Sequence, residues 1–142
     1  MTIDYKRLTA PCGIACFDCP LFEQNTQTPE RLALNTRRPQ LADMVCRGCR
    51  DQNCVLLDAP CPTRQCAEQH GVAFCHECPE FPCRLLAPLA DQAATFPHNI
   101  KVFNLCRIKS VGIDRWAENE SQSIRKDYFH ARFQIGAGPQ TD

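Results

Sequence analysis

The sequence first shows which classes of protein it does not resemble. Its 142 residues contain no run of about eighteen apolar residues, the length that a membrane-spanning helix needs. The first residues, MTIDYKRLTAPC, have no apolar core of the kind found in secretory signals, because Asp4, Lys6 and Arg7 interrupt the only candidate. We therefore expect a cytoplasmic protein that does not enter the membrane.

An excess of charge of one sign is also missing. The chain balances 16 Lys and Arg against 16 Asp and Glu, so it has no overall field that would attract nucleic acid or an anionic membrane. Aromatic residues are not interleaved with the basic ones, as platforms for stacked bases would be. Protein is therefore favoured over nucleic acid as a partner, and the oligomeric state does not follow from the sequence.

The common catalytic motifs are absent as well. The sequence has no Ser–His–Asp order, no glycine-rich phosphate loop and no His-Glu-x-x-His helix. A cysteine beside a histidine is the only nucleophile that the pattern offers. Metal binding explains the same cysteines better, so the sequence favours a protein that is not an enzyme.

Cysteine is the residue that the chain has in excess, with 12 in all. A domain of this length buries about two thirds of its unfolded surface and does not need crosslinks to compensate for small size. In the reducing cytosol, cysteines do not persist as disulfides but stay available as metal ligands. The cysteine content therefore predicts structural metal sites.

Three Cys-x-x-Cys spacings, at 16/19, 46/49 and 75/78, support this prediction. Such a turn brings two sulfur atoms to one side of a tight loop, at about the separation that tetrahedral zinc requires, and it directs backbone N–H groups at the first sulfur. Cys106 falls outside the clusters, on the apolar face of a predicted helix, and is expected to be a small core residue. The predicted metal ligands are Cys12, Cys16, Cys19, Cys46, Cys49, Cys54, Cys61, Cys66, Cys75, Cys78 and Cys83.

The number of ligands limits the number of ions. Two four-cysteine sites are the minimum for eleven clustered cysteines, and a third site would need shared thiolates or a histidine, with His70 and His76 the nearest. Without a third ion, His76 is expected to point to solvent. The favoured pairing, which spacing does not require, places Cys46, Cys49, Cys61 and Cys66 in one site and Cys75, Cys78 and Cys83 in another.

The first three cysteines leave a second cofactor open. Cys12, Cys16 and Cys19 have the spacing with which radical enzymes hold three irons of a four-iron cluster, although those enzymes need a barrel domain much longer than this chain. Proline directly after a cysteine, as at Cys19 and Cys78, also occurs in ferredoxins. Zinc at every site is the main prediction, and an iron–sulfur cluster at this triplet is the alternative.

Apolar patterning predicts a mostly α-helical fold in which zinc-knuckle-like loops pack on a helical half. Residues 46–83 contain six large aliphatic or Phe side chains, whereas residues 85–113 contain eleven. Strand signals are almost absent, so any sheet is expected to be a small ribbon at a metal site. The prediction is one domain over 1–142, with a metal-binding half at 10–83, a helical half at 84–133 and a disordered tail at 134–142.

Prolines and glycines divide the predicted helices. Thr28 followed by Pro29 is typical of a helix start, and Pro39 is expected to kink or split that helix. Gly71 and Gly112 are expected to end two others. The predicted helices are 29 to about 45, with Leu41, Met44 and Val45 on a buried face; 64–70; 83 to about 94; 97–111; and 115 to about 133, capped by Asp114 and with Trp116 packing inward.

The ordered motifs are Cys12-Gly13-x-x-Cys16-x-x-Cys19, Cys46-x-Gly48-Cys49, Cys61-x-x-Arg64-x-Cys66-Ala67, Gly71-Val72-x-x-Cys75-x-x-Cys78-x-x-Phe81-Pro82-Cys83 and Asn104-Leu105-x-Arg107-Ile108-Lys109-x-x-Gly112-x-x-x-Trp116. Together, over about residues 10 to 117, they resemble the small cysteine-rich proteins of the domain of unknown function 3795 family. The resemblance implies a metal-binding domain, usually taken to bind zinc, with no established activity. Cys54 fits this pattern less closely than the other ten clustered cysteines.

Three functions are compatible with these features. The first is a zinc-stabilised adaptor for a protein partner, and the second is a redox or metal sensor that uses labile thiolates or a cluster. The third is a nucleic-acid-binding zinc protein that acts through its arginines, which net charge disfavours. The arginines beside the cysteines, expected instead to offset thiolate charge, are Arg47, Arg50, Arg64 and Arg84.

Overall fold

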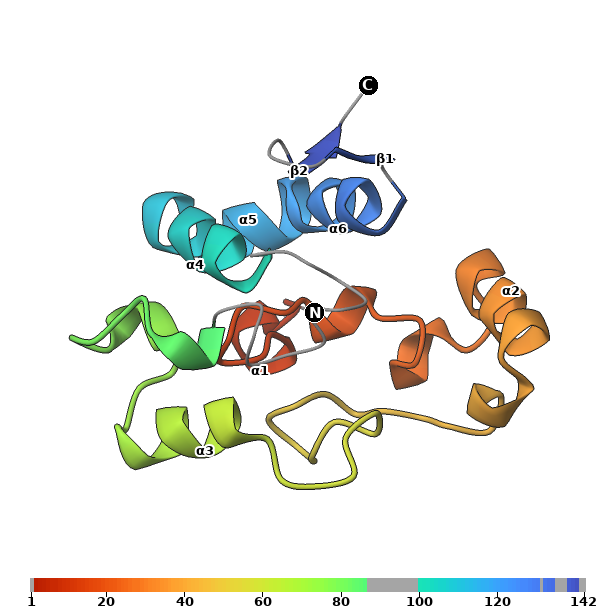
Figure 1. Ribbon diagram of the computed structural model, residues 1–142, viewed down its shortest axis with the longest axis horizontal. Coiled ribbons are helices and arrows are strands. Elements are labelled where there is room, and N and C mark those ends of the chain that lie inside the picture. Colours follow the sequence, from red (N-terminus) through yellow and green to blue (C-terminus); the bar gives the residue numbers. More distant parts are fainter. Residues whose placement is uncertain (1, 87–99, 131, 135–137, 141–142) are drawn as a thin grey trace.

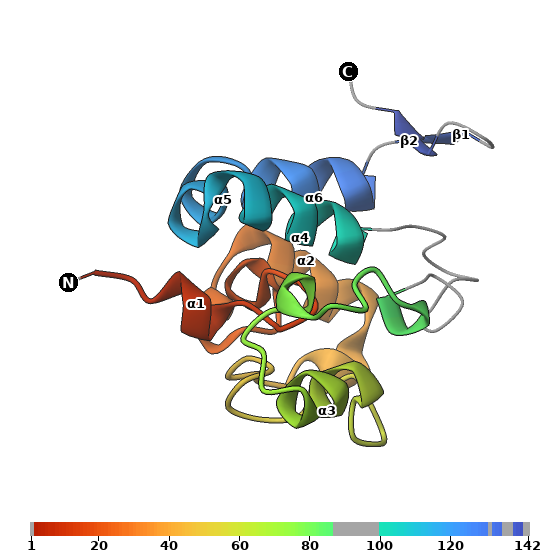
Figure 2. The same cartoon turned by 90° about the vertical axis from the view of Figure 1, so that its left-hand side faces the viewer.

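The computed structural model describes residues 2–86, 100–130, 132–134 and 138–140. This part of the chain is mostly helical, as predicted. Figures 1 and 2 show three C-terminal helices stacked over the N-terminal segment, with α3 on the opposite side of that segment. The elements are α1 (Tyr5–Leu8), α2 (Pro29–Arg37), α3 (Pro62–Gln69), α4 (Ile100–Val111), α5 (Ile113–Asn119), α6 (Ser121–His130), β1 (Arg132–Gln134) and β2 (Gly138–Gln140).

Helix α2 begins as its sequence predicts. The Thr28 hydroxyl accepts a hydrogen bond from the Arg31 N–H at 3.2 Å and caps the helix, with Pro29 in the first turn. The helix ends at Arg37, and Pro39–Leu41 forms a separate 3-10 turn, because proline disfavours helical backbone before it and cannot donate within a helix. The buried face expected at residues 41–45 is therefore wrong, and Val45 is 48% exposed.

The two helices ended by glycine also agree with prediction. Gly71 and Gly112 have φ of +65° and +88°, a backbone conformation that L side chains rarely adopt and that glycine allows where a helix ends. Helix α3 begins two residues earlier than predicted, at Pro62. Of the helix predicted from residue 83 to about 94, Arg84–Leu86 forms a 3-10 turn, and the remainder lies outside the described residues, as do residues 97–99.

The long helix predicted after Gly112 is two helices. Helix α5 starts at Ile113 with no side-chain cap, so Asp114 lies in the first turn instead of capping it. The break falls at Glu120, where the backbone leaves helical geometry. Its carboxylate accepts two hydrogen bonds from the Arg107 guanidinium, at 2.8 and 2.7 Å, which ties the break to α4.

The core joins the cysteine loops to the helices. Trp116 on α5 is completely buried and meets the edge of Phe17 at 6.2 Å between ring centroids. Helix α4 packs against the 3-10 turn Cys75–Glu77, and α6 packs against the turn Cys16–Asp18. The division of the chain at residue 83 stays a prediction. The main core contains residues from before and after that position: Ala15, Phe74, Leu86, Leu105, Ile108, Trp116 and Ala117.

The orientation of α4 corrects the expectation for Cys106. Its buried side chains are Ile100, Asn104, Leu105 and Ile108. Cys106 is exposed and is not the core residue that the sequence suggested, since it lies one position, or about 100°, beyond Leu105 around the helix. Phe103, two positions before Leu105 on the same helix, is also on the exposed side, at 53%.

The small sheet lies at the end of the chain. Strand β1 pairs antiparallel with β2, with Arg132 opposite Gln140 and Gln134 opposite Gly138. The ribbon lies on the far side of α6 from the cysteine loops, so the sheet expected at a metal site is not there (Figure 1). In the described part of the chain, every helix is too short or too polar to cross a membrane.

Candidate metal centre

Eight of the eleven predicted ligands line two pockets. The first cysteine pocket is lined by Cys12, Cys49, Cys54 and Cys61, with Thr63 and Arg64 beside them. The second cysteine pocket is lined by Cys66, Cys75, Cys78 and Cys83, with His70 and Glu80 beside them. Each pocket is therefore lined by four cysteines, the number of ligands that one tetrahedral zinc ion takes. Their sulfur atoms are not gathered as closely as the ligands of a bound ion, since within the described residues the group whose ligand atoms all lie within 4.8 Å of one another is His70, Cys78 and Glu80.

The distribution of cysteines between the pockets differs from the favoured pairing. Cys61 and Cys66 were expected in one site, but Cys61 lines the first pocket and Cys66 the second. Helix α3 separates them, because Cys61 precedes its first turn and Cys66 lies five residues further on. At about 100° per residue, that step turns the Cys66 side chain well away from the direction of Cys61.

The other three cysteines are neighbours of the first pocket. The Cys16 thiol forms a hydrogen bond with that of Cys49, which lowers the pKa of Cys16. The Cys49 thiol also forms a hydrogen bond with the thiol of Cys54, and these two hydrogen bonds raise the pKa of Cys49. Cys46 and Cys19 lie next to these residues. The charge of Cys16 acts on Cys46, and the charge of Cys46 acts on Cys19. Seven thiols thus lie near enough to one another for their charges to interact.

Three of these sulfur atoms share one local pattern of backbone N–H donation, and Cys16 has other backbone donors, Ala10 and Cys49. In each of the three cases the N–H belongs to the residue two positions after the cysteine, and such hydrogen bonds stabilise a thiolate. Gly48 permits one of these turns, because its φ is +98° and its N–H lies 3.4 Å from the Cys46 sulfur. The donor and acceptor pairs are Ile14 with Cys12, Leu21 with Cys19 and Gly48 with Cys46.

Burial favours the neutral form of three of the thiols in particular. It raises the pKa of Cys12 and of Cys19 to about 11, and that of Cys75 to about 12. The nearby thiols add to the effect at Cys75, because neighbouring thiolates would repel one another. A bound cation is what would convert such a group to thiolates at neutral pH.

Buried Arg31 holds the loops on either side of α2. Its guanidinium donates to the carbonyl of Pro20 at 3.0 Å, just after Cys19. It also donates to the turn before Cys46, reaching the carbonyls of Leu41, Ala42 and Met44 at 3.3, 2.9 and 2.6 Å. One buried side chain therefore holds the chain after Cys19 close to the turn before Cys46. No local sequence pattern predicts this role.

Arg50 links the first cysteine pocket to the Cys75 loop. Its guanidinium donates to the carbonyls of Thr9 and Ala73, at 2.8 and 2.6 Å. It also lies over the Phe74 ring, 4.9 Å from the centroid. Burial lowers the pKa of Arg50, and Cys16 and Cys12 act against that shift, so this arginine has the position expected for offsetting thiolate charge.

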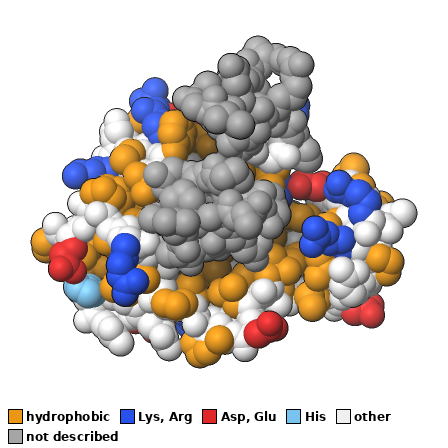
Figure 3. Space-filling view, viewed as in Figure 1, with side chains coloured by type: hydrophobic (Ala, Val, Ile, Leu, Met, Phe, Trp, Pro, Cys, Tyr) orange, Lys and Arg blue, Asp and Glu red, His pale blue; other side chains and the backbone are white. Residues whose placement is uncertain are grey.

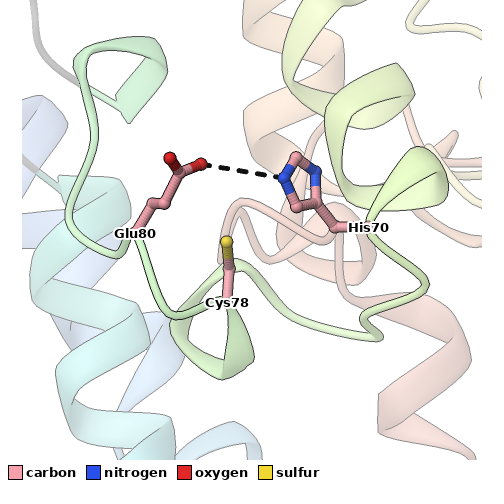
Figure 4. A group of neighbouring side chains, drawn as sticks. All are labelled: His70, Cys78 and Glu80. Atoms are coloured by element: carbon pink, nitrogen blue, oxygen red, sulfur yellow. Dashed lines mark ion pairs between the residues drawn. The ribbon is translucent and has the colours of Figure 1, made fainter.

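A mixed group of potential ligands lies at the second cysteine pocket. The ligand atoms of His70, Cys78 and Glu80 all lie within 4.8 Å of one another (Figure 4). From the sequence, His70 was predicted only as a ligand for a third ion, and Glu80 was not among the predicted ligands. The helical spacing of Cys66 and His70, four residues apart, was the available signal. His76 is elsewhere, stacked on Phe74 at 5.7 Å.

The comparisons with known proteins identify the family. A family model described as a protein of unknown function (DUF3795) matches residues 8–88, more than half of the chain. The chain belongs to this family. The DUF3795 match includes all the clustered cysteines and both pockets, but it ends before α4, so the motif at residues 104–116 lies outside it. No curated protein and no solved structure matches the chain.

Proposed function

We propose that this DUF3795 protein is a zinc-stabilised module for binding a protein partner, with at least two structural zinc ions. One observation carries the proposal: two separate pockets are each lined by four cysteines. Four sulfur ligands with no position left for substrate are typical of structural zinc. In this proposal Cys16, Cys19 and Cys46 support the first ion or share thiolates with a third.

The arrangement of the first three cysteines favours zinc over a four-iron cluster. A cluster at the triplet would use Cys12, Cys16 and Cys19 together. Cys12 instead lines the first cysteine pocket, and Cys16 is hydrogen-bonded to Cys49. Cys12 and Cys16 thus both have Cys49, from a separate loop, as a neighbour, which supports a zinc site built from two loops.

The loop between Cys54 and Cys61 suggests how metal would serve binding. Leu56 and Leu57 on this loop are 49% and 38% exposed, and both loop ends line the first cysteine pocket. A zinc ion there would fix the loop and present two apolar side chains to a partner. On the face seen in Figure 3, Lys and Arg side chains stand in separate groups with acidic ones between them, which is unlike the continuous basic stripe of a nucleic-acid binder.

Elemental analysis of anaerobically purified protein tests the metal assignment. We expect colourless protein with at least two zinc ions per chain. Cys61→Ser and Cys66→Ser should each lower the zinc content by one, because these neighbours line different pockets, whereas exposed Cys106→Ser should not. Brown protein that absorbs near about 400 nm would replace zinc with a cluster, and less than one zinc per chain would refute the proposal.

The partner assignment needs a separate test. A partner identified by cross-linking to the full chain should be lost when Leu56 and Leu57 are both changed to Asp. The zinc content of that variant should stay that of the wild type. Unchanged binding by the variant would remove this loop from the proposed interaction surface.

A further inference from the structure

The second cysteine pocket has more ligand atoms than one ion can use. Four thiolates complete the shell of a tetrahedral zinc ion, yet a histidine and a carboxylate line the same pocket. Figure 4 shows the side chains of His70 and Glu80 directed toward each other, with the Cys78 sulfur beside the space between them. An imidazole nitrogen and a carboxylate oxygen therefore lie close to the sulfur atom of Cys78, one of the four cysteines of the pocket.

The imidazole of His70 is oriented as a metal ligand. Its Nδ1 lies 2.8 Å from the carbonyl oxygen of Cys66, and a hydrogen bond to a carbonyl requires the proton on that nitrogen. In the neutral ring, Nε2 then keeps its lone pair, on the side that faces Glu80. Metal-binding histidines in proteins are commonly fixed by such a bond from the other ring nitrogen.

The spacing between His70 and Glu80 suits an ion between them. Their Nε2 and Oε2 atoms are 3.7 Å apart, too long for a hydrogen bond. Two N or O ligands bound at about 2.0–2.1 Å to one tetrahedral zinc lie about 3.3 Å apart. A small closure of the two exposed side chains, which are 41% and 78% exposed, would therefore bring both into coordination.

We propose that His70, Cys78 and Glu80 form a second zinc position at the mouth of the second cysteine pocket, through which zinc enters and leaves the four-cysteine site. This rests on the proposed function, which supplies the inner site. Three protein ligands leave a fourth position to water, and nitrogen and oxygen hold zinc less firmly here than four thiolates do. The outer ion is thus the exchangeable one.

Entry from this position needs no other reactant. Zinc stays bound to Cys78 while it exchanges His70 nitrogen, Glu80 oxygen and water for the sulfur atoms of the other three cysteines. Each of those thiols loses its proton to solvent as its bond to zinc forms. Release follows the same steps in reverse, with an acceptor chelator taking the ion from the outer position.

The experiment uses zinc-loaded full chain and Co²⁺ as the probe. Wild type should bind one further Co²⁺ per chain, seen in the visible absorption of the ion, with the inner zinc retained. Glu80→Gln and His70→Gln should each weaken that extra binding by at least about tenfold. They should also slow zinc transfer to a chelator by a similar factor. His76→Gln, which changes a histidine outside the group, should match the wild type.

Two results would overturn the outer position while leaving the inner site intact. One is a zinc-loaded wild type that binds no further Co²⁺. The other is a Glu80→Gln variant with unchanged Co²⁺ binding and zinc transfer, as expected if Glu80 and His70 form only an ion pair. Glu80 decides the test because it is highly exposed and its substitution leaves the fold unperturbed. Wild type that retains no zinc would instead refute the proposed function.

Discussion

The side-chain amide of Asn104 donates a hydrogen bond to the carbonyl oxygen of Gly13 at 2.9 Å, across 91 positions of sequence. Gly13 directly follows Cys12, so this bond seats the first cysteine loop on α4. The fit is close, because a Cβ atom at Gly13 would lie 3.0 Å from both the Leu105 side chain and the Lys101 carbonyl oxygen. The position of Cys12 thus depends on a helix outside the family match.

Gly13→Ala should therefore destabilise the protein more than Gly71→Ala. Both glycines have positive φ, at +89° and +65°, which costs an alanine about 1–2 kcal/mol. Only Gly13 adds a steric clash, worth about 1–3 kcal/mol, because a Cβ at Gly71 meets nothing within 4 Å. Chemical denaturation of the zinc-loaded variants measures the difference. Equal losses of unfolding free energy would show that α4 yields to the added methyl group.

Arg31→Met should lower the free energy of unfolding by more than about 3 kcal/mol. The substitution removes the donors to four carbonyl groups, and each acceptor left without a partner costs about 1–3 kcal/mol when buried. Arg37→Met, in the last turn of the same helix and exposed, is the matched control and should change stability little. A small effect at Arg31 would mean that water replaces the guanidinium.

Removal of zinc should loosen the chain unevenly. With a chelator at neutral pH, amide hydrogen exchange should rise first at residues 46–61, whose loops depend on cysteine ligands in the proposal. Residues 100–117 should stay protected longer, because Leu105, Ile108 and Trp116 form the core there. Re-addition of zinc should restore the exchange pattern. Exchange that is unchanged by the chelator would contradict a structural role for the metal.

Glu120 should titrate below its ordinary pKa. The hydrogen bonds from Arg107 lower the pKa of this carboxyl group from 4.5. Because the folded-state pKa is depressed, the pair stabilises the fold at neutral pH, and that contribution is lost as pH falls through the lowered pKa. NMR titration should show the pKa of Glu120 rising toward 4.5 in Arg107→Gln. An unchanged pKa would mean that the pair does not form in solution.

Features set by neighbouring residues were predicted well. The start of α2 follows from Thr28 and Pro29, and the ends of α3 and α4 follow from Gly71 and Gly112, because capping is a local matter. Helix α4 was harder, since its apolar residues are spread around the helix. Its buried face includes Asn104, a polar residue whose role depends on Gly13, far away in sequence.

The spacing of the cysteines in the sequence could not predict which of them line the same pocket. A Cys-x-x-Cys turn fixes two sulfur atoms relative to each other, but it does not say which loops meet. Whether Cys66 joins Cys61 or Cys75 depends on where α3 begins, and it begins at Pro62, directly after Cys61. Cys54, which fitted the family pattern least, lines the first cysteine pocket with Cys49. Contacts between distant loops, more than residue type, decided these outcomes.

The packing of Trp116 gives the protein an optical reporter of its own. It is the one tryptophan in the chain, fully buried, and its indole meets Phe17, which lies between Cys16 and Cys19. Any movement of that cysteine turn away from α5 would open the indole to water and shift its fluorescence to longer wavelength. If zinc binds at the first cysteine pocket as proposed, its binding should therefore be visible in the fluorescence of the unlabelled protein, in real time and at low concentration.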